Sequence, residues 1–418
     1  MPVRVIPPDP DRPRTDSFTP EEQRAGFVLR LARALHTAGT PANRLEEVLT
    51  DIAHRLGLIA HFFTTPTSVF AAFGPPERQR THLFRVEPGA YNLRHLAELD
   101  KVADDVRTGR ATVVEGSQRI DTILSAPPRY PWWIVLIAYG LASAAGCRFL
   151  GGGLAEIQLA FAAGLVMGGL SFALKSVALF DLVGSFVGAL LVGAAAAAGY
   201  RCAISTTTLA ALIVILPGLT LTLAMTELAS RHLASGTARL AGALTVFLVM
   251  IVGVAVANGV LALAYGPVRS VPVVPLPDDT RYIALGLAPL GFGVLMRARP
   301  VDFPAIYVAS IVAYFGMQAG QRALGAELGA SVGSFAIGLV TNAYERLRLG
   351  PAGVPLTPGV LLLVPGSIGF RSVTALLDAN TVAGIDTAFT MFLTAAALAA
   401  GLLVANLVLP PRRASRPA

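Results

Sequence analysis

Two Pro-Gly pairs interrupt apolar stretches that are otherwise long enough to cross a lipid bilayer. Pro217-Gly218 lies within the run ILPGLTLTLA, and Pro365-Gly366 lies within VPGSIGFRSV, 148 residues further along the chain. Proline removes a backbone donor and clashes with the preceding turn, so each pair is expected to break its helix. Backbone groups freed inside a membrane must line a cavity or be buried against protein. The two pairs therefore constrain both the fold and the place where a ligand can bind.

The charged residues are concentrated near the start of the chain. Of the 33 Lys and Arg and the 26 Asp and Glu, residues 1–130 contain 17 and 16. The remainder is dominated by apolar runs of about twenty residues, the length that spans a bilayer. The chain is therefore predicted to be an α-helical polytopic membrane protein. We identify ten spans, at 132–149, 154–173, 177–199, 203–223, 238–264, 281–297, 303–321, 328–344, 357–376 and 385–409.

The polar front part is predicted to be a small cytoplasmic α+β domain at 21–128, after a Pro-rich disordered tail at 1–20. Thr40 is expected to cap its second helix, with Pro41 at the first helical position. Its histidines show no metal-ligand spacing, so neither a metal nor a cofactor is expected. Periodicity predicts helices at 21–39, 40–56, 93–108 and 112–124, and strands at 59–64, 68–73 and 81–86.

Further matches lie 148 or 149 residues apart, close to the offset of the two Pro-Gly pairs. GSFVG from Gly184 corresponds to GSFAIG from Gly333, and Asn258 corresponds to Asn406, each preceded by alanine. The apolar part is therefore expected to consist of two membrane repeats of five spans each. Because five is odd, the second repeat must enter the bilayer from the opposite side, which gives a 5+5 inverted-topology repeat. The repeats are predicted at 131–266 and 281–410.

Broken helices in corresponding positions of such repeats form the substrate site of many secondary transporters. Hydroxyl, amide and charged side chains near the two breaks suit a small zwitterion, although each pair could instead be a tolerated kink. The predicted substrate-binding residues are Pro217, Gly218, Thr220, Thr222, Asn258, Pro365, Gly366, Ser367, Arg371 and Asn406. Ionisable residues within the spans or close to their ends are candidates for proton coupling, and these are Glu156, Asp181 and Glu227.

The basic residues of the predicted loops favour a cytoplasmic location for both termini. With that orientation, eleven Lys and Arg lie on the inner side and six on the outer side, the bias typical of cytoplasmic loops. No basic stripe with interleaved aromatic residues is present, so nucleic acid is not an expected partner. No GxxxxGK[ST] loop is present, so active transport would use an ion gradient. The sequence leaves open whether copies of the chain form a homo-oligomer.

Three motifs resemble those of the threonine/serine exporter family. They are AG-x-P-x-x-R-x-E-E from Ala38 to Glu47, the Pro66-Thr67 turn, and VPGS from Val364 to Ser367. The resemblance covers nearly the whole chain after residue 20. It implies a ten-span carrier of the bacterial inner membrane that exports threonine or serine with the proton motive force. Related two-component members are associated with export of dicarboxylates such as succinate.

Two alternatives stay open beside an amino acid exporter. A dicarboxylate exporter would favour more cationic groups near the breaks than Arg371. A membrane-tethered hydrolase is the other, because the N-terminal module of the family has been proposed to be hydrolase-like. No GxSxG elbow surrounds Ser68 in that module, so a nucleophile is not indicated there. We therefore expect a secondary transporter and not an enzyme.

Overall fold

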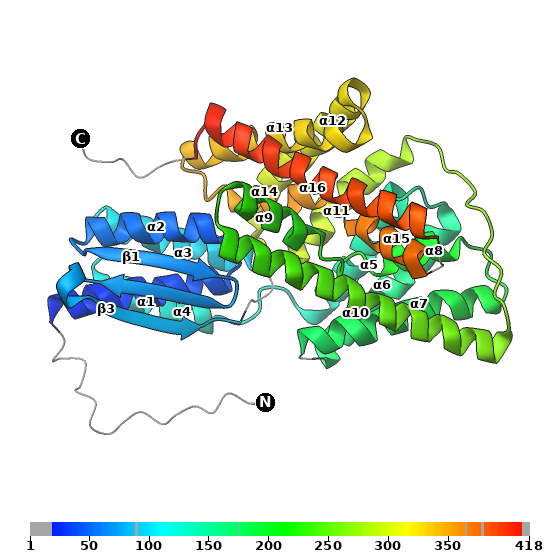
Figure 1. Cartoon of the computed structure of the whole chain (residues 1–418), viewed down its shortest axis with the longest axis horizontal. Coiled ribbons are helices and arrows are strands. Elements are labelled where there is room, and N and C mark those ends of the chain that lie inside the picture. Colours follow the sequence, from blue (N-terminus) through cyan, green and yellow to red (C-terminus); the bar gives the residue numbers. More distant parts are fainter. Residues whose placement is uncertain (1–18, 88–90, 175, 364–365, 378–379, 412–418) are drawn as a thin grey trace.

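The computed structural model describes residues 19–87, 91–174, 176–363, 366–377 and 380–411. These residues form an N-terminal α+β unit and a larger, entirely helical part (Figure 1). The tail up to residue 18 lies outside the described residues, as do Val364 and Pro365. The helical part carries long apolar helices, and the protein is a multi-pass membrane protein.

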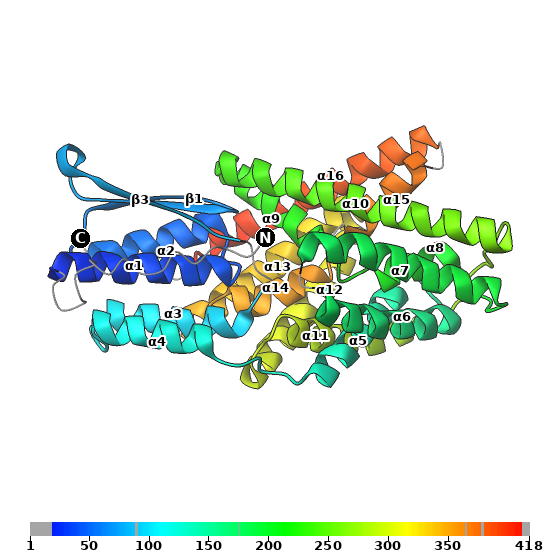
Figure 2. The same cartoon turned by 90° about the horizontal axis from the view of Figure 1, so that it is seen from below.

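The N-terminal unit has a three-stranded antiparallel sheet in the order β1-β2-β3, covered on one face by helices. Strand alternation buries Val69 and Ala71 against the helices, while Phe63, Phe70 and Leu83 face one another on the uncovered face. α1 and α2 lie next to the sheet and α3 and α4 lie beyond them (Figure 2). The elements are α1 (Pro20–Thr37), α2 (Ala42–Arg55), β1 (Ala60–Thr65), β2 (Ser68–Phe73), β3 (Arg80–Arg85), α3 (Leu93–Arg107) and α4 (Val113–Ser125).

These helices and strands confirm the elements predicted for the polar front part, with one local error. The prediction that Thr40 caps the second helix is wrong: α2 begins at Ala42, Pro41 occupies the N-cap, and no side chain of that residue bonds the helix. The Thr40 hydroxyl is buried and has no hydrogen-bond partner among the described residues. The free N–H groups of α2 must therefore be satisfied by another part of the chain.

The helical part contains two pairs of short helices among longer ones. The longer helices are α5 (Trp132–Phe149), α6 (Leu154–Ala173), α7 (Val177–Ala197), α10 (Leu233–Tyr265), α11 (Thr280–Leu295), α12 (Phe303–Leu324), α13 (Ala326–Arg346) and α16 (Thr381–Val408). The short pairs are α8 (Ile204–Ala211) with α9 (Gly218–Ala229), and α14 (Gly353–Leu361) with α15 (Gly366–Leu377).

Within the described residues, 7 helices are long and apolar enough to cross a membrane. The other three predicted spans correspond to the α8 and α9 pair, to α11 and to α13. α11 has 16 residues and α8 only 8, so neither reaches the length of about 20 residues that a perpendicular span needs. In contrast, α10 has 33 residues, about 50 Å of helix, and extends beyond a hydrocarbon core of about 30 Å.

Glycines set the closest helix contacts in the membrane part. A Cβ atom added at Gly253 of α10 would lie 2.9 Å from the Cβ of Ser185 in α7. One added at Gly401 of α16 would lie 2.0 Å from the hydroxyl of Ser334 in α13. Both serines are buried. Such small-residue contacts let membrane helices approach closely without large side chains between them.

We call the contact between the N-terminal unit and the membrane part the seam. Leu93 and Ala97 of α3 pack there in one apolar cluster with Ala298, Ile306 and Val354. The Leu93 amide donates to the Met296 carbonyl at 2.9 Å, just after α11. The seam therefore fixes the N-terminal unit on the ends of membrane helices, as Figure 1 shows for α2, α9 and α14.

Candidate functional site

The first break lies between α8 and α9, within one predicted span. α8 ends at Ala211, a turn follows, and Pro217 occupies the N-cap of α9. The Pro217 carbonyl accepts from the Leu221 amide at 2.9 Å, and the Thr222 hydroxyl donates to the Gly218 carbonyl at 3.1 Å. α9 is therefore an independent helix whose first N–H groups have no partner within it.

The second break lies between α14 and α15, and its helix end meets the first break. Gly366 begins α15. A Cβ atom added at Gly366 would lie 3.2 Å from the Cα of Gly218 and 3.3 Å from the Cβ of Leu216. Any side chain at position 366 would press on the backbone of the first break. The two Pro-Gly sites, 148 residues apart in sequence, are therefore neighbours in space.

This junction brings together the N-termini of α9 and α15. The start of a helix carries partial positive charge and unpaired N–H groups, which favour anionic ligands. Both helices have 12 residues, long enough for this effect to develop. The arrangement suits the carboxylate of a small substrate, and Pro217 and Gly218 provide the sharp entry that exposes the backbone.

The predicted polar residues lie at different distances from the junction. Thr220 and Ser367 belong to the first turns of α9 and α15, and both are partly buried. Thr222 is buried and bonds within its own helix. Arg371 lies further along α15 and is exposed. Thr220 and Ser367 are thus the predicted hydroxyl side chains nearest in sequence to the two helix starts.

The two predicted asparagines lie apart from the junction. Asn258 is on an exposed position of α10. Asn406 is also exposed, near the end of α16, and its side-chain oxygen accepts from the Asn342 amide group at 2.8 Å. These asparagines correspond in sequence, but the structure does not bring them together near the two breaks.

The acidic residue Glu156 has a clear structural role at the end of the bundle away from the N-terminal unit. Its carboxylate is buried and accepts from the amides of Gly153 at 3.0 Å and Ala203 at 2.8 Å. It thus caps α6 and ties it to the start of α8. Asp181 in the first turns of α7 is partly exposed, and its carboxylate has no hydrogen bond or ion pair within the described residues.

Glu227 lies at the seam, in the last turn of α9. Its carboxylate is 1% exposed and accepts from the Ala42 amide at 3.1 Å and the Ser235 hydroxyl at 2.6 Å. Arg239 Nε lies 3.0 Å from both carboxylate oxygens. Glu227 is therefore the missing N-terminal cap of α2, and it joins the half-helix after the first break to the N-terminal unit.

The rest of the AG-x-P-x-x-R-x-E-E motif also lies at the seam. Gly39 has a φ of +98°, and an added Cβ atom would meet the Tyr91 ring at 2.6 Å, so only glycine fits. Arg44 forms ion pairs with Glu47 at 3.2 Å and with Glu345 in the last turn of α13. Glu46 accepts from the amide and hydroxyl of Thr64, at 2.7 and 2.8 Å. The motif therefore attaches α2 to both the membrane part and the sheet.

Sequence reasoning missed Ser235, Arg239 and Glu345 as members of this contact. Ser235 and Arg239 are four residues apart on α10 and share a face, which is a weak signal that could have been noticed. Their partner lies 8 and 12 residues earlier, across the turn from α9. Glu345 is separated from Arg44 by 301 positions, and no local pattern connects them.

Two family models match most of the chain. One, described as "Putative threonine/serine exporter", covers residues 26–261. The other, described as "Threonine/Serine exporter, ThrE", covers residues 282–408. The boundary between the matches falls in the connection from α10 to α11. No solved structure matches the chain.

Several fungal proteins are similar to this chain. It is 26% identical over 383 residues to pheromone-regulated membrane protein 10 of Candida albicans, covering 88% of this chain and 34% of that protein. The protein of that name in Debaryomyces hansenii is 27% identical, with coverages of 87% and 37%. An uncharacterised protein of Schizosaccharomyces pombe is 28% identical, with 83% and 48%. The chain thus spans between a third and a half of these relatives.

Proposed function

Because this chain belongs to the threonine/serine exporter family, we propose that it is a secondary active transporter that exports threonine, serine and similar small hydroxy amino acids. The observation that carries the site is the contact of Gly218 with Gly366, which brings the starts of α9 and α15 together. We place the substrate at this junction. The helix starts would hold its carboxylate, and Thr220 and Ser367 would contact its polar groups.

We further propose that the membrane part is an inverted repeat of two five-span halves. α5, α6, α7, the α8–α9 pair and α10 would correspond to α11, α12, α13, the α14–α15 pair and α16. The contact between Gly253 and Ser185 recurs as that between Gly401 and Ser334. The glycines are 148 positions apart and the serines 149, which supports the same correspondence as the Pro-Gly pairs.

The packing between the halves supports the same proposal. α9 packs against α16 of the other half, and α15 packs reciprocally against α10. Such an exchange is expected if a two-fold axis passes near the contact between the two breaks. Movement of one half against the other would then open the junction to each side of the membrane in turn.

We propose that the N-terminal unit lies in the cytoplasm, with both chain ends, and that the membrane is a bacterial inner membrane. Arg231, Arg297 and Arg348 follow α9, α11 and α13, and each has a positive φ, of 65°, 57° and 60°. Basic side chains at helix C-termini interact favourably with the helix macrodipole. If these three helix ends face the cytoplasm, their charges also agree with the positive-inside rule. Association of copies into a homo-oligomer stays a prediction.

We propose that Asp181 is the residue that couples transport to protons. The carboxylate of Glu227 is fixed by Arg239, and that of Glu156 by two backbone amides. Protonating either would break several interactions at once. Asp181 has no such partners among the described residues, so it can gain and lose a proton with little rearrangement.

Counterflow in proteoliposomes tests the transport proposal. Vesicles loaded with threonine should take up labelled threonine from outside, and unlabelled serine should compete for this uptake. Protein-free vesicles and vesicles challenged with labelled succinate are the controls. Saturable uptake of succinate without threonine would replace the proposal by a dicarboxylate carrier. Uptake of neither compound would contradict a carrier, and the N-terminal unit should then be assayed for hydrolysis.

A further inference from the structure

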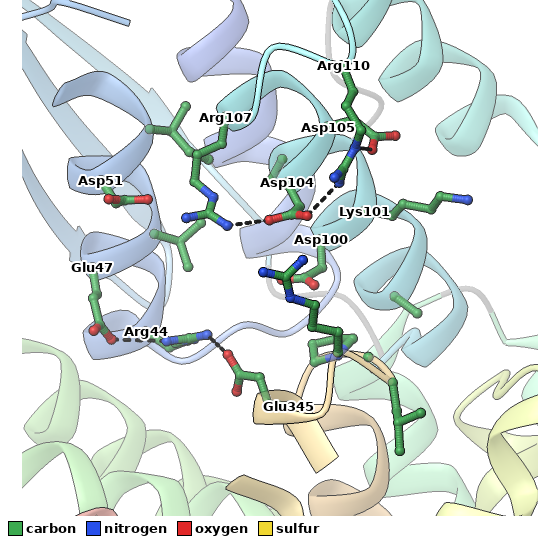
Figure 3. A pocket seen from close by; sticks show the side chains of 18 of the residues that line it. Arg44, Glu47, Asp51, Asp100, Lys101, Asp104, Asp105, Arg107, Arg110 and Glu345 are labelled. Atoms are coloured by element: carbon green, nitrogen blue, oxygen red, sulfur yellow. Dashed lines mark hydrogen bonds and ion pairs between the residues drawn. The ribbon is translucent and has the colours of Figure 1, made fainter. Parts of the chain in front are cut away.

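The N-terminal unit contacts both proposed halves of the membrane part, the first half (α5 to α10) and the second half (α11 to α16). A single helix of the unit does so. The first amide of α2, that of Ala42, donates to Glu227 of α9, in the first half. Two residues later, Arg44 pairs with Glu345 at the end of α13, in the second half. Figure 3 shows the Arg44 side chain pointing from α2 to Glu345. α2 therefore bridges the two halves at the seam.

The attachment of the unit to the second half is largely apolar. One buried cluster joins α3 to this half, and its members are Leu93, Ala97, Ala298, Ile306 and Val354. A Cβ atom added at Gly353, the first residue of α14, would lie 3.1 Å from Cδ2 of Leu96. Because apolar burial is favourable in proportion to the area removed from water, the unit is firmly anchored on the second half.

The contacts that join α2 to the first half are polar. Besides the bond from α2 to Glu227, Nδ1 of His232 lies 3.7 Å from the Glu46 carboxylate, between the start of α10 and α2. The His232 and Glu46 side chains remain partly exposed, at 30% and 19%. A contact between partly exposed groups adds little stability, since water can replace it. This attachment is therefore the easier one to release.

Release of α2 from the first half would leave no buried charge unpaired. Glu227 also accepts from the Ser235 hydroxyl at 2.6 Å and from Nε of Arg239 at 3.0 Å, and both donors belong to its own half. Only the Ala42 amide would lose its partner, and water entering the opened seam can take that place. The N-terminal unit is therefore expected to move together with the second half.

Two half-helices close the way from the N-terminal unit to the junction of the breaks. α9 runs from Gly218 at the junction to the seam, and α14 runs from the seam towards the second break. They pack against each other. Leu219 of α9 and Val360 of α14 belong to one buried cluster, against which the Tyr91 side chain of the unit packs. A substrate that comes from this side would have to part α9 from α14.

We propose that the N-terminal unit is a clamp that keeps the junction closed on its own side of the membrane. α9 belongs to the first half and α14 to the second, so a unit that bridges the halves holds these two half-helices together. α2 must part from α9 and α10 before a substrate can enter from that side, and the equilibrium between the two arrangements sets the rate of loading. This inference rests on the proposed transport function and on the proposed inverted repeat.

Cross-linking the unit to one half or to the other tests the clamp by threonine counterflow in proteoliposomes. Glu46→Cys with His232→Cys ties α2 to the first half, and Leu96→Cys with Gly353→Cys ties α3 to the second half. A short bis-thiosulfonate reagent would link each pair, and a reductant would release it. The first link should slow counterflow about tenfold or more, with recovery on reduction, because it blocks a required opening. The second link, the matched control, should leave the rate unchanged.

Labelling of a cysteine at the junction tests the clamp without any substrate. In Ser367→Cys, a membrane-impermeant thiol reagent is added on the side of the N-terminal unit. Labelling should become about fivefold or more faster when Glu227→Gln weakens the attachment to the first half. Asp121→Asn, at an exposed ion pair of the unit, should leave the rate unchanged. The native Cys147 and Cys202 are buried, and the protein without the Ser367→Cys change measures their background.

The two experiments separate the clamp from the transport proposal. Counterflow that is equally fast with and without the link between positions 46 and 232 overturns the clamp and leaves the transporter in place. Labelling that Glu227→Gln does not accelerate also counts against the clamp. If labelling responds to Glu227→Gln but no threonine counterflow occurs in any form of the protein, the clamp stands and the amino acid transporter does not.

Discussion

Gly218 and Gly366 touch through their backbones: a Cβ atom at position 366 would lie 3.3 Å from the Gly218 nitrogen and 3.2 Å from its Cα. Each glycine begins a half-helix that follows a proline in the sequence. The contact has no side chain at position 366, so a larger residue there would have to displace the backbone of the first break by a few tenths of an ångström. It makes the two breaks one structural site.

Replacing Gly366 by valine should reduce threonine counterflow by about tenfold or more, because two added methyl groups and a Cβ atom would force the breaks apart. Gly259→Val in α10 is the matched control, since an added Cβ atom there meets nothing within 4 Å. Initial rates at saturating threonine would be compared in vesicles with equal protein content. Equal activity of the two variants would remove the junction from the substrate site.

Replacing Glu227 by glutamine should destabilise the seam strongly. The change leaves the partly buried Arg239 beside a neutral group and weakens the cap of α2, and breaking a buried pair typically costs about 3–5 kcal/mol. We expect a lower melting temperature in detergent and faster protease cleavage of the connection between α4 and α5. Glu77→Gln on the surface of the N-terminal unit should change neither.

The interaction of Glu227 with Arg239 can be isolated by a double-mutant cycle. Arg239→Gln alone should destabilise the protein as well, and the double variant should be less destabilised than the sum of the two single changes. Additive effects would mean that the two side chains act independently, contrary to their 3.0 Å contact.

The protein should lose stability as the pH falls below about 6.5. Burial lowers the pKa of His36, and the hydrogen bond from its Nε2 to the Thr65 carbonyl, at 2.7 Å, only partly opposes this. Below the ordinary histidine pKa, the unfolded chain binds a proton that the folded chain does not bind. The free energy of unfolding therefore decreases as the pH falls through this range. Burial lowers the pKa of His95 as well, which adds to the same effect.

Melting temperatures between pH 5 and pH 8 would check this, with His36→Gln as the test variant. Glutamine can keep the hydrogen bond to Thr65 without titrating, so the variant should lose part of the acid sensitivity. His61→Gln, in which an exposed strand residue is changed, is the control. The same pH dependence in wild type and His36→Gln would show that other groups cause the loss.

Asp181→Asn should abolish the response of export to a proton gradient while leaving threonine exchange intact. Exchange needs no net proton movement, whereas export driven by a gradient requires a group that titrates. Counterflow and gradient-driven efflux would be measured in the same vesicles. Asp386→Asn, an exposed carboxylate near the start of α16, should retain both. Gradient-driven efflux by Asp181→Asn would exclude this residue as the proton carrier.

The local structure of this protein was readable from its sequence where periodicity and turn residues act within one element. The strand at 68–73 and the helix after Asn92 follow from such patterns, and so does the break at Pro217. Each depends on interactions between residues a few positions apart, which the printed order of residues preserves.

The wider arrangement was not readable, because it depends on partners far apart in the chain. Glu227 lies in an apolar segment and was therefore predicted to carry protons, yet it caps a helix that begins 185 positions earlier. Asn258 matches Asn406 in sequence, but the direction in which each helix face points is set by tertiary packing. Hydrophobic periodicity is weak in helices that are apolar on all sides, so it could not identify these faces.

The Glu227 carboxylate satisfies the first free amide of α2, and this has a consequence for how genes of this kind can be divided. A split between α4 and α5 would leave one product with an uncapped helix and the other with a buried acid that lacks one of its donors. The two products would have to find each other to become stable. When both parts belong to one polypeptide, they are held together without an association step. Any lineage that separated them should carry compensating changes at Ala42, Glu227 or Arg239.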